Sequence, residues 1–191
     1  MPQETPIKPK GPTICYHEDD YCMVEIVPRE NMAHIDEESN RLKSFTRDIP
    51  QEENNEIYLI NEMSVPLSTL QIKPEELDPL LELLDEKRYD QILTGYGSTM
   101  NQLHIGAVGY GSNWEAFFYD VQDGIVSHIW LVGHVFLDEE TVINCLHAIG
   151  QRWPLLLQDW ERVATVDLSS RAAIEEYIMD HEEDDDDEEE D

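Results

Sequence analysis

Three consecutive β-rich runs constrain the fold of this chain most strongly. They span residues 103–110, 114–121 and 125–132, and two short turn segments separate them, 111–113 and 122–124. The second turn contains an Asp-Gly pair, which is a strong signal for a tight β-hairpin. Bulky side chains on both faces of the middle run predict a central strand that is covered over most of both sides. Three aromatic residues are therefore expected to be buried: Trp114, Phe118 and Trp130.

Three helices are predicted beside this sheet. Residues 74–89 begin with a proline and two glutamates, which suit a first helical turn, and then carry leucines at helical spacing. A second helix follows Asp138, whose carboxylate is a favourable N-cap. A third helix follows Ser169 or Ser170, and three of its residues are expected to face the core: Ile174, Tyr177 and Ile178.

The other segments have shorter patterns. Residues 14–27 are typical of a β-hairpin around the polar turn 17–20, and residues 28–55 indicate loop or a short helix. Further strands are expected at 56–60, 155–159 and 162–168. Together these segments predict an α+β fold with one central antiparallel or mixed sheet and about three helices.

The 191 residues fit one domain with ends left over. Residues 1–13 contain four prolines and are expected to be a flexible lead-in. Residues 14–181 are predicted to form the α+β binding domain. Residues 182–191 are all acidic and offer nothing apolar to bury, so a disordered tail is expected there.

Acidity is the outlying feature of the composition. Asp and Glu number 43 against 12 Lys and Arg, which gives a formal net charge of −31. Removing the ten charges of the tail leaves −21, so the folded body is acidic as well. Nucleic acid and anionic membranes are not expected as direct ligands, because binding phosphates requires Lys and Arg. A basic protein, in contrast, gains steering and complementarity from such a surface. Acidity that serves only solubility is the alternative.

The sequence also predicts a cytoplasmic location. It contains no apolar run of the roughly 18 residues that a membrane-spanning helix requires. Residues 1–13 lack the apolar region of a signal peptide. Cys15, Cys22 and Cys145 are too few and too odd in number for a secreted disulfide framework.

Motifs for enzyme chemistry are missing from the sequence. It has no Gly-x-Ser-x-Gly, no His-Glu-x-x-His and no Walker lysine motif. The glycines between Gly106 and Gly111 have the wrong order for a dinucleotide fingerprint, and a strand pattern follows them where a helix would be needed. We therefore predict a protein that is not an enzyme and needs no cofactor. An enzyme with an unrecognised acid/base pair stays open as an alternative.

Histidine and cysteine side chains are potential metal ligands in this sequence. Cys15, His17, Cys22 and His34 could supply four donors, but their spacing matches no closed zinc pattern. Buried or partly exposed thiols are expected instead. His128 lies in a β-rich run, and a structural histidine is the more common outcome there.

The segment 159–177 resembles the closing strand and helix of bacterial polymorphic-toxin immunity proteins. The resemblance is carried by Asp159-Trp160, then by Val-Asp-Leu-Ser at 166–169, and then by Ile-Glu-Glu-Tyr at 174–177. It implies a cytoplasmic, antitoxin-like protein that binds a toxin domain, often at or near the active site of the toxin. Such a protein performs no chemistry itself.

Charge and resemblance together favour an immunity protein or inhibitor that blocks a basic toxin domain, one that acts on nucleic acid or nucleotides. Its carboxylates would stand where phosphates of the substrate sit. The alternative is an acidic chaperone or nucleic-acid mimic that holds basic proteins through the tail. The candidate partner-binding residues are Glu18, Asp19, Asp20, Asp120, Asp123, Glu182, Glu183, Asp184 and Asp185.

Overall fold

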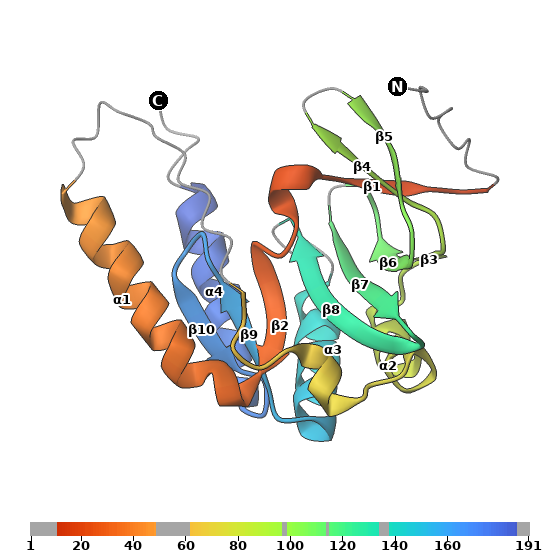
Figure 1. Cartoon of the computed structure of the whole chain (residues 1–191). Helices are drawn as coiled ribbons and strands as arrows, with labels where there is room; N and C mark the ends of the chain where they lie inside the picture. Colours follow the sequence, from red (N-terminus) through yellow and green to blue (C-terminus); the bar gives the residue numbers. More distant parts are fainter. Residues whose placement is uncertain (1–10, 49–61, 97–98, 114, 134–137, 187–191) are drawn as a thin grey trace.

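A seven-stranded sheet forms the centre of the fold, and all its strand pairs are antiparallel. This computed structural model describes residues 11–48, 62–96, 99–113, 115–133 and 138–186. The strand order is β10-β9-β2-β8-β7-β6-β3 (Figure 1). The strands are β2 (Val24–Pro28), β3 (Arg88–Tyr89), β6 (Ala107–Gly111), β7 (Ala116–Gln122), β8 (Ile125–Val132), β9 (Leu155–Asp159) and β10 (Ala164–Asp167).

A smaller three-stranded sheet packs on one face of the large one. Strand β1 (Ile14–His17) runs parallel to β4 (Ile92–Tyr96), and β4 pairs antiparallel with β5 (Thr99–His104). Ile14, Tyr16 and Ile92 of the small sheet share a buried core with Phe118 and Trp130 of the large one. The two layers approach closely at Gly109, where a Cβ atom would lie 2.7 Å from Ile14 Cδ1. A larger residue there would force the buried side chains of Ile14 and Phe118 to shift, so glycine suits that point of contact.

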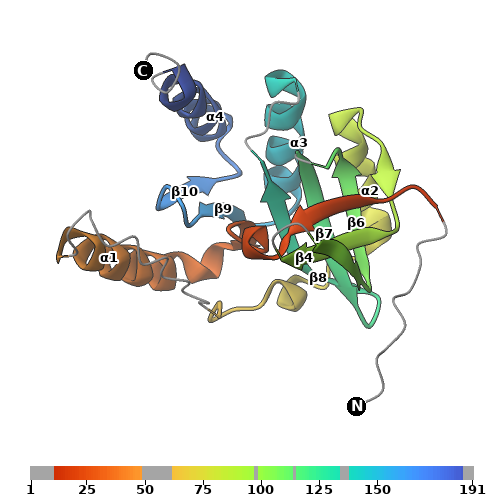
Figure 2. The ribbon, with the colours of Figure 1, turned by 90° about the horizontal axis from the view of Figure 1, so that it is seen from above.

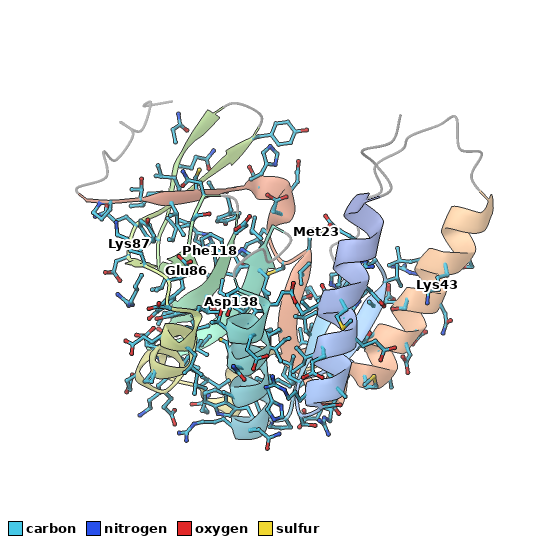
Figure 3. All side chains as sticks on the ribbon, turned by 180° about the vertical axis from the view of Figure 1, so that it is seen from behind. Met23, Lys43, Glu86, Lys87, Phe118 and Asp138 are labelled. Carbon is cyan, nitrogen blue, oxygen red and sulfur yellow. The ribbon has the colours of Figure 1, made fainter. Side chains whose placement is uncertain are left out.

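Three helices cover the opposite face of the large sheet. They are α2 (Pro74–Leu81), α3 (Glu139–Arg152) and α4 (Arg171–Asp186). The view from above separates them from the small sheet, which lies on the other side of the large sheet (Figure 2). From behind, they stand in front of the sheet, and Asp138 lies beside the start of α3 (Figure 3). The main hydrophobic core lies between these helices and the strands.

Helix α1 (Met32–Asp48) packs on the same face as the small sheet, farther along the large sheet (Figure 2). Its buried Ile35 contacts Val27 of β2 and Leu156 of β9 in a separate small core. The small sheet and α1 therefore cover different parts of the same face of the large sheet. Four short 3-10 helices complete the described chain: η1 (Glu18–Asp20), η2 (Arg29–Asn31), η3 (Leu67–Leu70) and η4 (Glu82–Leu84).

The α+β prediction is confirmed, as is the central hairpin. Strands β7 and β8 meet at Asp123 and Gly124, which both have positive φ, as a tight hairpin turn of this kind requires. Phe117 and Phe118 are both buried, on opposite faces of β7, so that strand is covered on both sides. The Asp138 cap of α3 is confirmed, and Ser170 is the serine that accepts a hydrogen bond from the first turn of α4, at Ala173 N.

The predicted hairpin over residues 14–27 is wrong. Strand β1 pairs with β4 in the small sheet, whereas β2 lies between β8 and β9 in the large one. Alternating apolar residues predict a strand but do not choose its partner. Residues 28–55 contain the 17-residue helix α1, which is longer than the predicted loop or short helix; its buried Ile35 packs against β2 and β9.

Two further boundaries differ from the prediction. The helix expected over residues 74–89 ends at Leu81, and after η4 the chain turns at Asp85, whose φ is 54°. The run 103–110 is divided between β5 and β6 by a turn at Gly106, so its two halves belong to different sheets. The predicted strand 56–60 and Trp114 lie outside the described residues.

The acidic C-terminal run begins inside α4, which ends at Asp186. Residues 187–191 lie outside the described part of the chain, so disorder of the tail stays a prediction. Within the described ranges, no helix has both the length and the apolar character needed to cross a membrane.

Candidate functional site

The acidic turn η1 follows directly from β1 and is closed by its own side chains. His17 caps it, since Asp19 N donates to His17 Nδ1 at 3.3 Å and His17 N donates to Asp20 Oδ2 at 3.3 Å. Glu18 is exposed, and Asp19 and Asp20 are partly exposed. Partial burial raises the pKa of Asp20. The turn therefore presents adjacent carboxylates in a fixed arrangement.

Tyr21 ties this turn to the large sheet. Its hydroxyl donates to Asp120 Oδ2 at 2.9 Å. Asp120 Oδ1 lies 3.0 Å from His104 Nε2, and Asp120 Oδ2 lies 3.8 Å from His128 Nδ1. The other ring nitrogen of His104, Nδ1, is 2.6 Å from the Tyr16 hydroxyl. We call the residues Tyr16, Tyr21, His104, Asp120, His128 and Trp130 the Asp120 cluster.

Ring packing holds the Asp120 cluster together. The Tyr21 ring meets Trp130 edge-on at 4.9 Å, and His104 stacks on Trp130 at 5.8 Å between centroids. Phe118 stacks on the indole of Trp130 at 5.3 Å. Such pairs contribute roughly 0.5–1.5 kcal/mol each beyond the area they bury. The cluster thus joins β1, the residue after η1, β5, β7 and β8 into one packed unit.

The chemistry of the cluster favours positioning over catalysis. Cys22, the nearest thiol, is half-buried, and burial and then the Glu25 carboxylate raise its pKa, so it stays protonated at neutral pH. A nucleophilic cysteine needs a lowered pKa. Burial likewise raises the pKa of the Tyr16 and Tyr21 hydroxyls. Asp120 is 6% exposed, and its carboxylate is surrounded by the groups that it orients.

Glu25 is the other perturbed carboxylate on this face. It is half-buried, and burial raises its pKa to about 7, although Trp160 Nε1 donates to Glu25 Oε1 at 2.9 Å and works in the opposite direction. Its register partners are Trp130 on β8 and Gln158 on β9. Glu25 therefore lies between Trp130 of the small-sheet core and Trp160, which packs against the α1 core.

The predicted partner-binding residues fall into three groups. Glu18, Asp19 and Asp20 lie together on η1. Asp123 is exposed in the β7–β8 turn, away from η1 (Figure 1). Glu182, Glu183, Asp184 and Asp185 belong to the last turns of α4, and their side chains lie outside the described residues.

Asp120 differs from the expectation of an exposed carboxylate, because it is buried and its carboxylate faces the interior. It lies on the inward face of β7, two residues after Phe118, and its carboxylate accepts from Tyr21. Sequence reasoning treated it as one of many surface acids and missed its partners Tyr21 and His104. No local signal could have found them, because Tyr21 and Asp120 are 99 residues apart in the chain.

Comparison of the chain with family models, curated proteins and solved structures finds no match. The residues of the immunity-protein resemblance can be placed in the fold. Asp159 Oδ1 accepts from Glu161 N and Arg162 N, and its Oδ2 accepts from the Tyr177 hydroxyl. Asp167 accepts from Ser169 N and Oγ and pairs with Arg29. These residues join β9, β10 and α4, so here the motif has a structural role.

The four candidate metal ligands are not assembled. Cys15 and His17 lie on β1, Cys22 follows η1, and His34 lies on α1. In the part of the chain that the structure describes, no three His, Cys, Asp or Glu residues form a group that could hold a metal ion.

Proposed function

We propose that this protein is an immunity protein or inhibitor that binds and blocks a basic protein, namely a toxin domain that acts on nucleic acid or nucleotides. The observation that carries the proposal is the surplus of surface carboxylate over positive charge. The chain holds 43 Asp and Glu against 12 Lys and Arg. Much of its positive charge is already paired with carboxylates: Arg29, Arg41, Arg88, Arg152 and Arg171.

Preorganisation of η1 supports the same proposal. Carboxylates held in a closed turn lose less conformational freedom on binding than carboxylates on a flexible segment. The Asp120 cluster fixes that turn through Tyr21. A basic surface that binds phosphates would find carboxylates in a fixed array, and charge complementarity would speed the encounter. The proposal places the protein in the cytoplasm.

An acidic chaperone or nucleic-acid mimic is the second candidate, and the ten consecutive acids at 182–191 are the observation that favours it. Binding would then be carried by the tail, salt-sensitive and poorly specific, because a charged run has no apolar anchor.

The test is capture of partners by the tagged full-length chain from its source cells, followed by assay of each captured protein. The immunity proposal expects one basic enzyme whose activity the chain abolishes, with slow dissociation that survives deletion of residues 182–191. Rates at two salt concentrations should show association slowing markedly, since exposed charges are screened beyond about 10 Å at 0.1 M salt. Capture of many basic proteins without inhibition, lost on deletion of the tail, would instead establish the chaperone.

A further inference from the structure

The N-cap of η1 is a histidine, His17, where Ser, Thr, Asp or Asn is usual. The side-chain oxygen of those usual caps accepts a hydrogen bond from the helix at neutral and at mildly acid pH alike. A histidine ring nitrogen accepts only while it carries no proton, and histidine is the side chain that ordinarily changes charge between about pH 5 and 8. The cap of η1 therefore depends on the protonation of one ring.

The ring atom Nδ1 of His17 has two partners with opposite requirements. Asp19 N donates to Nδ1 at 3.3 Å, and this hydrogen bond needs a lone pair on Nδ1. The carboxylate oxygen Oδ2 of Asp19 lies 3.2 Å from the same Nδ1, and that contact is attractive only when Nδ1 carries a proton. The two interactions exclude each other, so the proton on Nδ1 decides which of them holds.

The other groups around His17 leave this choice to the ring itself. Asp20 Oδ2 accepts from the backbone His17 N at 3.3 Å, and burial raises the pKa of Asp20. From β4, the Tyr96 ring lies 5.4 Å from the His17 ring. Glu18, the remaining acid of the turn, is exposed. Asp20 is thus the second titrating group of the turn, and it holds the backbone of His17 rather than its ring.

The far end of the turn meets two further histidines. Tyr21 donates to Asp120 Oδ2, and Asp120 also lies 3.0 Å from His104 Nε2 and 3.8 Å from His128 Nδ1. A proton on either histidine increases its attraction to Asp120. It does not remove the acceptor of Tyr21, because a carboxylate has about four lone-pair positions. The Tyr21 end therefore stays closed while the His17 cap changes.

We infer that η1 is a proton-sensitive turn: protonation of His17 releases the Asp19 amide from the cap and draws the Asp19 carboxylate into an ion pair with the ring. In neutral solution the first residues of the turn are capped and all three of its acids carry free charge. In mildly acid solution the cap opens, and the charge of Asp19 is compensated by His17. The inference goes beyond the proposed function, since it concerns the turn itself and needs no partner.

The test is nuclear magnetic resonance of the nitrogen-labelled full chain between about pH 8 and pH 5.5. At the upper end, the ring nitrogen shifts of His17 should show Nδ1 without a proton. As the ring becomes protonated, solvent exchange of the Asp19 amide, corrected for the intrinsic pH dependence of exchange, should become about 5-fold faster, as expected for loss of a helix cap. The change should follow the titration of the His17 ring.

Three variants separate the ring from its surroundings. His17→Asn supplies a cap oxygen that does not titrate, so Asp19 exchange should lose its response to pH. Asp20→Asn keeps an acceptor for His17 N and removes the second titrating group, so the response should persist. His147→Asn is the matched control, because it removes a histidine of α3 on the other side of the large sheet, and it should behave as the parent does.

A proton on Nδ1 at about pH 8, or Asp19 exchange that ignores the protonation of His17, would overturn the inference. An equal response in His17→Asn and the parent would do the same. The ring measurement uses only the parent chain, so it decides the matter even where a variant is unstable.

Discussion

The two faces of the seven-stranded sheet are covered in different ways. On the helical face, α2, α3 and α4 bury a large core made mostly of aliphatic and aromatic side chains. On the other face, the small sheet buries a smaller core, and beside it lie the buried Asp120 carboxylate, two partly exposed histidines and two tyrosine hydroxyls. Burial of apolar side chains stabilises the fold but is non-directional. Hydrogen bonds, in contrast, fix the relative position of the groups they join.

The difference indicates that the two faces have different roles. The helical face stabilises the sheet, and the small-sheet face holds η1 in place through the Tyr21–Asp120 hydrogen bond. Polar networks between layers are costly when they are incomplete, so they are expected where a particular geometry is needed. Four predictions test this contrast, from the largest expected effect to the smallest.

Trp130→Ala should cause the largest loss of stability on the small-sheet face. Trp130 is fully buried and stacks on Phe118 and His104. Truncation of a buried Trp costs about 3–5 kcal/mol, measurable by denaturant unfolding. Trp130→Phe is the control: it keeps a ring in the stack and removes an indole N–H that has no hydrogen-bond partner among the described residues, so it should cost much less. A soluble Trp130→Ala protein as stable as the parent would show that the small sheet contributes no core.

Asp120→Ala should loosen η1 specifically. It leaves the Tyr21 hydroxyl without its acceptor and removes the carboxylate that lies 3.0 Å from His104 Nε2, a loss of about 1–3 kcal/mol. Hydrogen exchange at residues 18–21 should accelerate beyond the loss of global stability. Leu146→Ala, in the helical core, is the matched variant, because it should lower global stability without that local effect. If hydrogen exchange at residues 18–21 accelerated equally in both variants, the proposed difference in role between the two faces would be refuted.

Glu25→Gln should stabilise the protein above neutral pH. The folded-state pKa is raised to about 7, so between the unfolded value near 4.5 and 7 the folded state holds the extra proton. Stability is therefore lost as pH rises through this window, and the loss is complete above it. Gln can still accept from Trp160 and avoids the loss, a gain of about 1–2 kcal/mol at pH 8 that vanishes below about pH 4.5. Parallel stability curves for variant and parent from pH 4 to 8 would refute the perturbed carboxylate.

Deletion of residues 182–191 should have the smallest effect. These acids repel one another and the acidic body, so the melting temperature should stay the same or rise slightly, within about 0.5 kcal/mol of stability. Thermal unfolding at low salt gives the most sensitive measurement. A clear drop in melting temperature would show that the end of α4 packs on the body.

Patterns contained within one segment were predictable from the sequence. The β7–β8 hairpin follows from Asp123-Gly124, the start of α3 from Asp138, and the inward face of α4 from Ile174, Tyr177 and Ile178, which are all buried. In each case the signal and the structure lie within a few residues of each other. The net charge could also be predicted from the sequence, because it is a sum over the chain.

Tertiary structure alone decided which strands pair and which acids are exposed. Asp19 and Asp120 look alike in the sequence, yet Asp19 lies in the surface turn η1, whereas Asp120 is buried and accepts a hydrogen bond from Tyr21. Cys15, Leu93 and Leu103 form one row only because β1 pairs with β4 and β4 with β5. Strand pairing depends on burial and hydrogen bonding that many distant segments satisfy together. A local sequence pattern therefore does not contain it.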